Sequence, residues 1–262
     1  MIWLNGQWQG EAQVAVSDRG FTLGDGLFET MKTSQGRILR RERHETRLRA
    51  SAQALGLPDP LAGVKLDDLA REMTERLEQD ALILRFSVSA GEGVRGLVRP
   101  SEPCLTRCLT GAPAGDAPDH LTLALSNIRR SGSSLSARHK TLSYVDNLSA
   151  RRQARLEGAD MGLLLDTRGY LSGGDSANLF WFADGRWYTP ALDCGVLAGT
   201  VRAELLEQVD IQEGRYAPSE LLRADVVVMS NAAFGLVPVR KLGGHDLTED
   251  TARLDQLKAL LD

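Results

Sequence analysis

One lysine of this sequence has neighbours that favour a chemical role. Lys140 lies between a loop rich in small residues, 129–137, and a helix expected to begin near Tyr144. The chain takes nearly all of its positive charge from arginine and contains only five lysines, so a lysine here is a specific choice. An amine can form a Schiff base and, once desolvated, can act as a general base, whereas a guanidinium can do neither. Lys140 is therefore the candidate nucleophile and base, and a solvated loop lysine is the alternative.

Three places in the chain offer groups that suit a phosphate. Gly199-Thr200-Val201 opens an expected helix, whose first backbone amides and positive dipole end favour an anion. Ser230-Asn231-Ala232 ends an expected strand and adds amides in a loop, and Arg47 can supply a bidentate charge. Each alone is explained equally well by a helix cap, a turn or a surface arginine. The three together predict an anion site.

A glycine-rich segment, Gly91-Glu92-Gly93-Val94-Arg95-Gly96, matches the dinucleotide-binding fingerprint and follows an expected strand. That fingerprint requires a helix directly after it to hold the pyrophosphate. The next seven residues, 97–103, carry two prolines and no helical pattern. We therefore reject a nicotinamide cofactor.

These residues need elements to position them, and the spacing of apolar residues and turn signals predicts both helices and strands. The expected helices cover residues 41–55, 66–77, 144–157, 201–208 and 252–261, and the longer expected strands cover 27–33, 81–89, 103–109, 121–125, 161–165, 179–182 and 226–229. A linker of small residues and prolines, 111–119, separates an α+β unit of residues 1–110 from an α/β unit of residues 120–262.

Composition narrows the class of protein. Hydrophobic residues make up 42% and charged residues 25%, as in ordinary globular proteins, and the net charge of -4 gives no footprint for nucleic acid. The first residues show no signal-peptide pattern, so we expect a cytoplasmic protein without membrane attachment. The three cysteines fit neither a disulfide framework nor a zinc signature, and we expect no metal site.

Six motifs, taken in order, resemble the class IV aminotransferase family of fold-type IV pyridoxal phosphate enzymes. They are Asp18 to Thr30, His44 to Leu48, Lys140, Ser176 to Phe180, Gly199 to Arg202, and Ser230 to Ala233. The resemblance implies a two-domain fold with the cofactor cleft between the domains, pyridoxal 5'-phosphate on Lys140, and a homodimer.

The resemblance also assigns roles to single residues. It implies phosphate contacts from Arg47, Thr200, Val201, Asn231 and Ala232. Tyr144 would bond the phenolic oxygen of the cofactor, with a core aromatic as the alternative, and Asn178 would belong to the cofactor site. Thr30 is a candidate for proton transfer, with an inward strand hydroxyl as the alternative, and Arg95 is a candidate for a substrate carboxylate, with a solvated loop arginine as the alternative.

One position departs from the family pattern. Relatives carry a glutamate five residues before the asparagine equivalent to Asn178, and it pairs with the protonated pyridine nitrogen. Here that position is Gly173. Asp175 faces the same side if the segment is extended, and we expect it to supply the missing charge from two residues further on. Otherwise the ring nitrogen is less well protonated.

Within the family, the short chain and the motifs around Phe28-Glu29-Thr30 most resemble aminodeoxychorismate lyase. The implied reaction converts 4-amino-4-deoxychorismate to 4-aminobenzoate and pyruvate in folate biosynthesis. One alternative is an aminotransferase acting on D- or branched-chain amino acids. The other, raised by Gly173, is a homologue that binds the cofactor but is catalytically weakened.

Overall fold

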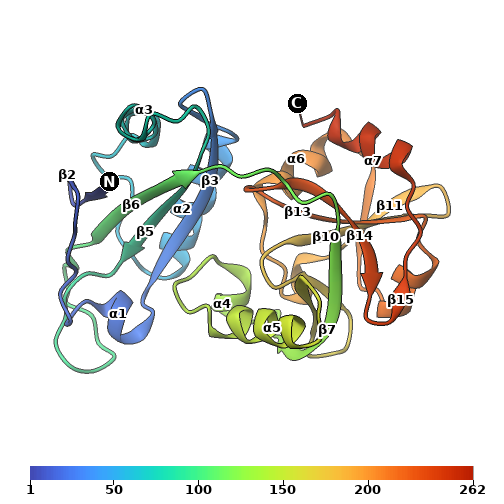
Figure 1. Ribbon diagram of the computed structural model, residues 1–262. Helices are drawn as coiled ribbons and strands as arrows, with labels where there is room; N and C mark the ends of the chain where they lie inside the picture. Colours follow the sequence, from blue (N-terminus) through green and yellow to red (C-terminus); the bar gives the residue numbers. More distant parts are fainter. Residues whose placement is uncertain (262) are drawn as a thin grey trace. The chain divides into compact units, whose positions relative to one another are not determined.

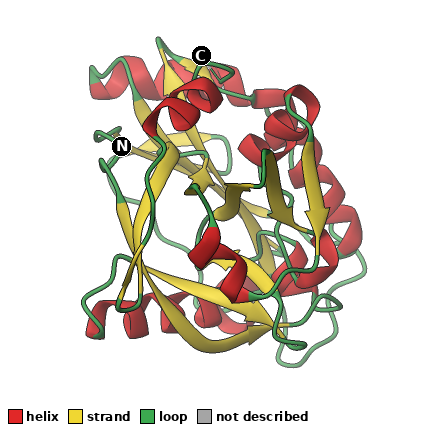
Figure 2. Cartoon of the chain, turned by 90° about the vertical axis from the view of Figure 1, so that its right-hand side faces the viewer, coloured by secondary structure: helices red, strands yellow, loops and turns green. Residues whose placement is uncertain are grey.

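The computed structural model describes residues 1–261 and divides the chain into two compact units. The first unit comprises Met1–Gly115 together with the short segment His139–Ser143, and the second comprises the rest. The chain therefore passes into the second unit after Gly115 and returns to the first for five residues that include Lys140. Figure 2 distinguishes the helices from the strands and shows the mixed α and β content that the sequence predicted.

The first unit contains a six-stranded antiparallel sheet (Figure 1). In spatial order its strands are β2 (Gln7–Gln9), β1 (Ile2–Leu4), β6 (Thr106–Pro113), β5 (Leu82–Ser89), β3 (Gly26–Ser34) and β4 (Arg37–Ile38). Asn5 and Gly6 both take positive φ values, 48° and 94°, and so make the tight turn between β1 and β2. The strand β6 continues to Pro113, so the first residues of the expected linker belong to the sheet.

Helices α1 (Arg19–Leu23), α2 (Arg41–Ala54) and α3 (Leu66–Leu77) belong to the same unit. The apolar residues of α3 recur every three or four positions, so one face of the helix is buried in the core. That face consists of Leu66, Leu69, Ala70 and Met73. The helix α2 is much more polar, and its buried positions include His44 as well as Leu48.

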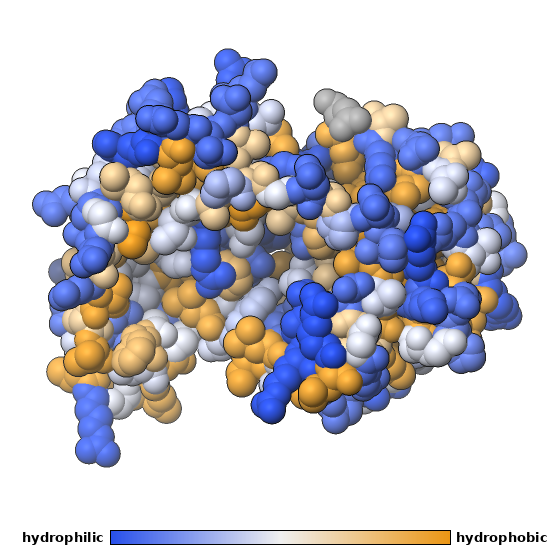
Figure 3. Space-filling view, in the orientation of Figure 1, coloured by the Kyte–Doolittle hydropathy of each residue, from blue (hydrophilic) through white to orange (hydrophobic). Residues whose placement is uncertain are grey.

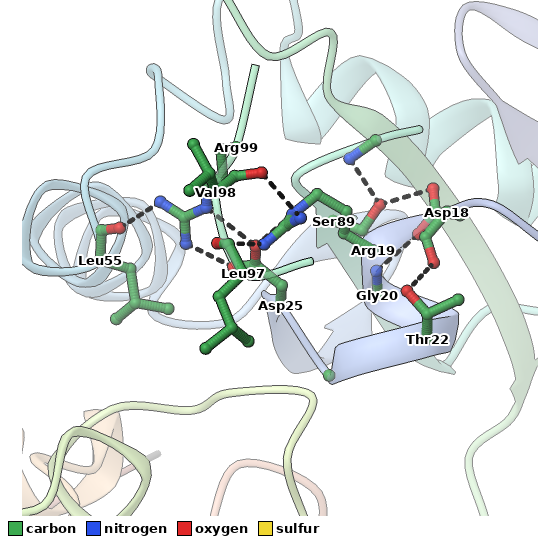
Figure 4. A network of polar contacts seen from close by, with 12 residues as sticks. Asp18, Arg19, Gly20, Thr22, Asp25, Leu55, Ser89, Leu97, Val98 and Arg99 are labelled. Atoms are coloured by element: carbon green, nitrogen blue, oxygen red, sulfur yellow. Dashed lines mark hydrogen bonds and ion pairs between the residues drawn. The ribbon is translucent and has the colours of Figure 1, made fainter. Parts of the chain in front are cut away.

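Buried charges fix the loop that follows β5. Arg19 donates to the carbonyl oxygens of Gly96, Leu97 and Val98, and its Nε donates to Asp25 at 2.8 Å. Arg99 also bonds Asp25, so two arginines share one carboxylate (Figure 4). The hydrogen bonds from Arg99 outweigh burial and hold the pKa of Asp25 below its ordinary value. Residues 91–105 thus form an ordered loop and short bridge rather than a helix.

The second unit contains a nine-stranded mixed sheet. Its strands are β7 (Leu121–Arg130), β8 (Met161–Asp166), β9 (Leu171–Gly174), β10 (Asn178–Ala183), β11 (Arg186–Pro190), β12 (Ile211–Gly214), β13 (Val226–Asn231), β14 (Gly235–Leu242) and β15 (His245–Asp246). Its helices are α4 (Leu135–Arg138), α5 (Val145–Leu156), α6 (Thr200–Gln208) and α7 (Thr251–Lys258), with 3-10 turns at Leu192–Cys194 and Pro218–Arg223.

Alternate residues of β10 and β13 enter two different apolar clusters, as expected for strands buried on both faces. Phe180 and Val228 pack with α6 and α7, which lie together over this part of the sheet (Figure 1). Leu179 and Met229, on the other face, pack with residues of β7, β8 and β9, so the sheet curls on itself. Helix α5 covers β7 and β8.

Candidate active site

Lys140 lies in the short segment that returns to the first unit and runs beside β3. The Phe28 amide donates to the Lys140 carbonyl oxygen at 2.9 Å, and the Leu142 amide donates to the Gly26 carbonyl oxygen at 2.9 Å. The Lys140 Nζ lies 4.3 Å from the centre of the Phe28 ring. The backbone on both sides of Lys140 is therefore fixed, and its amine lies against an aromatic face.

The same segment is tied to the helix that carries Arg47. His139, next to Lys140, shares a hydrogen bond of 3.0 Å with the Ser51 hydroxyl. Ser51 follows Arg47 by one turn on the same face of α2. The structure thus brings the segment of Lys140 to the helix face that presents Arg47, although the two are 93 positions apart in the chain (140 − 47).

Glu29 holds Arg47 in place. It lies on β3 with a side chain only 1% exposed, and it accepts hydrogen bonds from Arg47 Nε at 2.8 Å and Nη2 at 2.5 Å. His44 Nδ1 lies 2.7 Å from the same carboxylate. Burial raises the pKa of Glu29, but the Arg47 charge and the His44 hydrogen bond outweigh it and bring the pKa to about 2. Burial lowers the pKa of His44 despite this contact, which favours a neutral ring that donates to Glu29.

Sequence reasoning gave Glu29 and His44 no role in the site. A signal was present, because His44 and Arg47 are three residues apart on one helix face and buried charged side chains are usually paired. The identity of that carboxylate depends on how β3 packs against α2. No local pattern reveals it.

Two further predicted residues lie in the first unit. Thr30 is two positions after Phe28 on β3 and so points to the same face, the one that Lys140 approaches. Arg95 is exposed in the loop that Arg19 holds. The roles of both residues stay predictions.

In the second unit, the start of α6 has the character of an anion site. Gly199 is its N-cap residue and offers no side-chain cap, and Thr200 and Val201 follow as buried residues. The side chain of Asn178 packs so closely on Gly199 that a Cβ there would collide with its Oδ1, and its Nδ2 bonds the Leu197 carbonyl oxygen at 2.9 Å. Asn178 therefore shapes the turn that opens α6.

The end of β13 lies beside this turn through its neighbour β10. Ser230 pairs with Asn178 in the sheet, and the Ser230 hydroxyl is buried without a hydrogen-bond partner among the described residues. Asn231 shapes the next loop, because its Oδ1 accepts from the Ala233 and Phe234 amides at 2.9 Å. A buried hydroxyl without a partner is costly, so this corner favours a polar ligand.

The Asp175 side chain, expected from the sequence to stand in for the carboxylate missing at Gly173, is bonded to other groups of the protein. The strand β9 ends at Gly174, and the Asp175 side chain, from a residue 2% exposed, accepts from Arg151 Nε at 2.8 Å, Arg151 Nη2 at 2.6 Å and the Gly162 amide at 2.8 Å. These three bonds hold the Asp175 carboxylate against α5 and β8. Its assignment to the ring nitrogen stays a prediction.

Gly173 is itself constrained to be glycine. Its φ is +151°, which L-residues rarely adopt, and a Cβ there would lie 3.1 Å from the Ala177 carbonyl oxygen. The other group near that Cβ position is Arg130 Nη1, at 3.9 Å. Tyr144, which precedes α5, interacts electrostatically with the same guanidinium.

Comparison with known proteins decides the family. Residues 26–242 match the model of the amino-transferase class IV family. The chain belongs to this family. Class IV aminotransferases and lyases are pyridoxal phosphate-dependent enzymes, so the chain is one of them, and the predicted fold class is confirmed.

Individual relatives include both lyases and aminotransferases. The chain is 26% identical to the aminodeoxychorismate lyase of Bacillus subtilis, with 92% of this chain and 86% of the relative covered. It is 27% identical to a putative branched-chain-amino-acid aminotransferase of Methanocaldococcus jannaschii, with 93% and 88% covered. The fold is similar to the crystal structure of 4-amino-4-deoxychorismate lyase from Pseudomonas aeruginosa, with a TM-score of 0.86. The two sequences are 30% identical, and the match covers 99% of this chain and 98% of the lyase chain.

Several of the predicted site residues fit the cofactor of the family. The start of α6, whose N-cap residue Gly199 has no side chain, and the Ser230 hydroxyl, which has no partner among the described residues, suit a phosphate, and the fixed Lys140 suits a covalent anchor. Among the described residues, the atoms nearest the Cβ position of Gly173 belong to Ala177, Arg130 and Asn178, and none of them is a carboxylate oxygen. The structure also shows that, over residues 1–261, no helix is long and apolar enough to span a membrane.

Proposed function

We propose that the protein is a pyridoxal-phosphate-dependent 4-amino-4-deoxychorismate lyase that produces 4-aminobenzoate and pyruvate. The observation that carries the proposal is the match of nearly the whole chain, at 30% identity, to the P. aeruginosa lyase. The B. subtilis lyase supports it over 92% of this chain.

The residues would divide the work between anchoring, binding and proton transfer. Lys140 would hold the cofactor, and its Nζ, once released by the substrate amine, would take the proton from the substrate α-carbon. The bound cofactor supplies an electron sink for the carbanion formed there. Thr30, on the Phe28 face of β3, would pass a proton to or from the substrate.

The phosphate would bind through fixed donors. The first amides of α6 at Thr200 and Val201, and the loop amides at Asn231 and Ala232, would donate to its oxygens. Arg47 would add a positive charge, and its ion pair with Glu29 would set the orientation of its guanidinium. Tyr144 would bond the phenolic oxygen of the cofactor, and Asn178 would keep the α6 turn in shape.

The aminotransferase alternative is supported by the M. jannaschii relative, and the weakened-homologue alternative by Gly173. A comparison of substrates with the purified protein separates the three. We expect pyruvate and 4-aminobenzoate in equal amounts from aminodeoxychorismate. Conversion of D-alanine or a branched-chain amino acid with an α-keto acid, without lyase products, would indicate an aminotransferase, and no conversion of any amine would indicate the weakened homologue.

We further propose that the protein assembles as a homodimer. Its first unit exposes an apolar patch formed by Phe21, Val94, Leu97 and Val98, whose exposed fractions are 76–84%. Arg19 joins α1, which carries Phe21, to the loop that carries the other three. In Figure 3, hydrophobic residues, coloured orange, gather on the surface of the first unit where Figure 1 shows α1. A patch of this kind favours association with a second copy.

A further inference from the structure

Arg130 is a partly buried cation that has no carboxylate partner within ion-pair distance in the described part of the chain. It is the last residue of β7. Its guanidinium donates from Nη2 to the carbonyl oxygens of Gly174 at 3.0 Å and Asp175 at 3.4 Å. Within residues 1–261, its Nη1 makes no hydrogen bond to the protein. Burial lowers the pKa of Arg130, although Tyr144, Asp175 and Asp146 partly offset this.

The carboxylate with the largest effect on the pKa of Arg130, that of Asp175, is bonded to other groups. Both Asp175 oxygens accept from Arg151, and one also accepts from the Gly162 amide. Asp146 is an exposed residue in the first turn of α5. A guanidinium in this position still has donor capacity, and its desolvation favours a ligand that accepts a hydrogen bond.

Two glycines, Gly195 and Gly173, leave room for the Arg130 side chain. A Cβ on Gly195 would lie 2.8 Å from the Arg130 Cβ, so the side chain passes where residue 195 has none. At its other end, Nη1 lies 3.9 Å from the Cβ position of Gly173. A side chain at residue 173 would therefore project into the space that the Arg130 guanidinium borders. Because residue 173 is glycine, no side chain of its own lies between that space and Arg130 Nη1.

We propose that Arg130 is the partner of the cofactor's pyridine nitrogen and donates a hydrogen bond to it, so that this nitrogen stays unprotonated. The inference rests on the proposed function for the presence of the cofactor. An arginine remains protonated at any ordinary pH and has no acceptor atom, so it binds a neutral ring nitrogen and disfavours a charged one. Arg130 is a cofactor-contacting residue in this scheme, and Asp175 is a structural residue that holds Arg151 and β8.

The test measures the protonation state of the ring nitrogen directly. The purified protein is loaded with pyridoxal phosphate labelled with ¹⁵N in the ring, and the ¹⁵N chemical shift is recorded from pH 6 to pH 9. We expect the shift of an unprotonated, hydrogen-bonded pyridine throughout. A pyridinium shift at pH 7 in the parent protein overturns the proposal, whatever the variants do.

Variants then assign the effect to one arginine. Arg130→Leu removes the nearby positive charge, so the ring nitrogen should titrate at a higher pH than in the parent, and cofactor affinity should fall about tenfold. Arg130→Lys should keep the nitrogen unprotonated. Arg129→Leu is the matched control, because Arg129 is an exposed neighbour that bonds the Ser126 carbonyl oxygen, and its spectrum should equal that of the parent.

Two other outcomes are decisive. An unchanged titration in Arg130→Leu overturns the proposal, and a titration shifted only by Asp175→Asn would assign the nitrogen to Asp175 instead. If the parent protein binds no cofactor and borohydride fixes none to Lys140, the proposed function fails together with this inference. Cofactor binding with a pyridinium nitrogen defeats the inference alone.

Discussion

The Arg47 guanidinium forms two hydrogen bonds with the Glu29 carboxylate, and this carboxylate is only 1% exposed. A buried ion pair of this kind contributes little net stability compared with an apolar pair, but loss of one partner is severe because the other charge remains buried. In this protein the pair also orients the cation proposed to bind the phosphate. Glu29 therefore affects both stability and cofactor binding.

Acid should destabilise the protein through Glu29. Its folded pKa of about 2 lies below the ordinary value of 4.5, so its contribution is full above pH 4.5 and is lost as the pH falls towards 2. The difference corresponds to roughly 3 kcal/mol. Urea unfolding at several pH values should show that Glu29→Gln costs about this much at pH 7 and progressively less towards pH 3. A cost that does not vary with pH would mean that the carboxylate is not charged in the folded protein.

Arg47→Ala should weaken cofactor binding. The phosphate loses a nearby cation, and hydrogen bonds to charged groups contribute about 1.5–3 kcal/mol, so the dissociation constant should rise about tenfold or more. Arg49→Ala is the control, because Arg49 lies on the same helix but is half exposed and pairs with Glu45. Fluorescence titration with pyridoxal phosphate measures both. Equal dissociation constants for the two variants would place the phosphate away from Arg47.

Asp175→Asn should lower the stability of the second unit. The Asp175 carboxylate accepts three hydrogen bonds, two of them from Arg151, and the neutral amide, with a single acceptor oxygen, cannot keep all three. We expect a loss of about 1.5–3 kcal/mol in urea unfolding. Asp184→Asn, in an exposed turn, should change stability by less than about 0.5 kcal/mol. A silent Asp175→Asn would contradict the structural role given to Asp175 here.

The proposed homodimer should depend on the apolar patch. Leu97→Asp places a charge in the centre of Phe21, Val94, Leu97 and Val98, so sedimentation velocity should show a shift from dimer to monomer. Leu156→Asp provides a control, because Leu156 is 80% exposed but lies at the end of α5, away from the patch residues in the chain. A parent protein that is monomeric at micromolar concentration would rule out the homodimer.

The sequence predicted elements where local patterns were strong. Helix α3 has the predicted bounds, because Leu66, Leu69 and Met73 recur at helical spacing. The short strands β9 and β12, of four residues each, were missed, since such strands form through pairing with distant neighbours rather than through their own pattern.

Prediction of the site had the same limit. Lys140, Arg47 and the start of α6 carry their chemistry in local motifs. Glu29, the partner of Arg47, is 18 residues away in the chain, and only the packing of β3 on α2 brings the two together. Arg151, the partner of Asp175, is 24 residues away, and only the packing of β8 and β9 with α5 brings those two together. For Gly173, the expectation of an extended Asp175 ignored that the strand β9 stops one residue earlier, at Gly174.

The most direct test of the account is where the cofactor is attached. The purified protein is incubated with pyridoxal phosphate, reduced with borohydride, digested and mapped by mass spectrometry. We expect the reduced cofactor on Lys140 Nζ and on none of Lys32, Lys65, Lys241 or Lys258, and no label in Lys140→Arg. Label on another lysine, or no label in a folded parent protein, would contradict it.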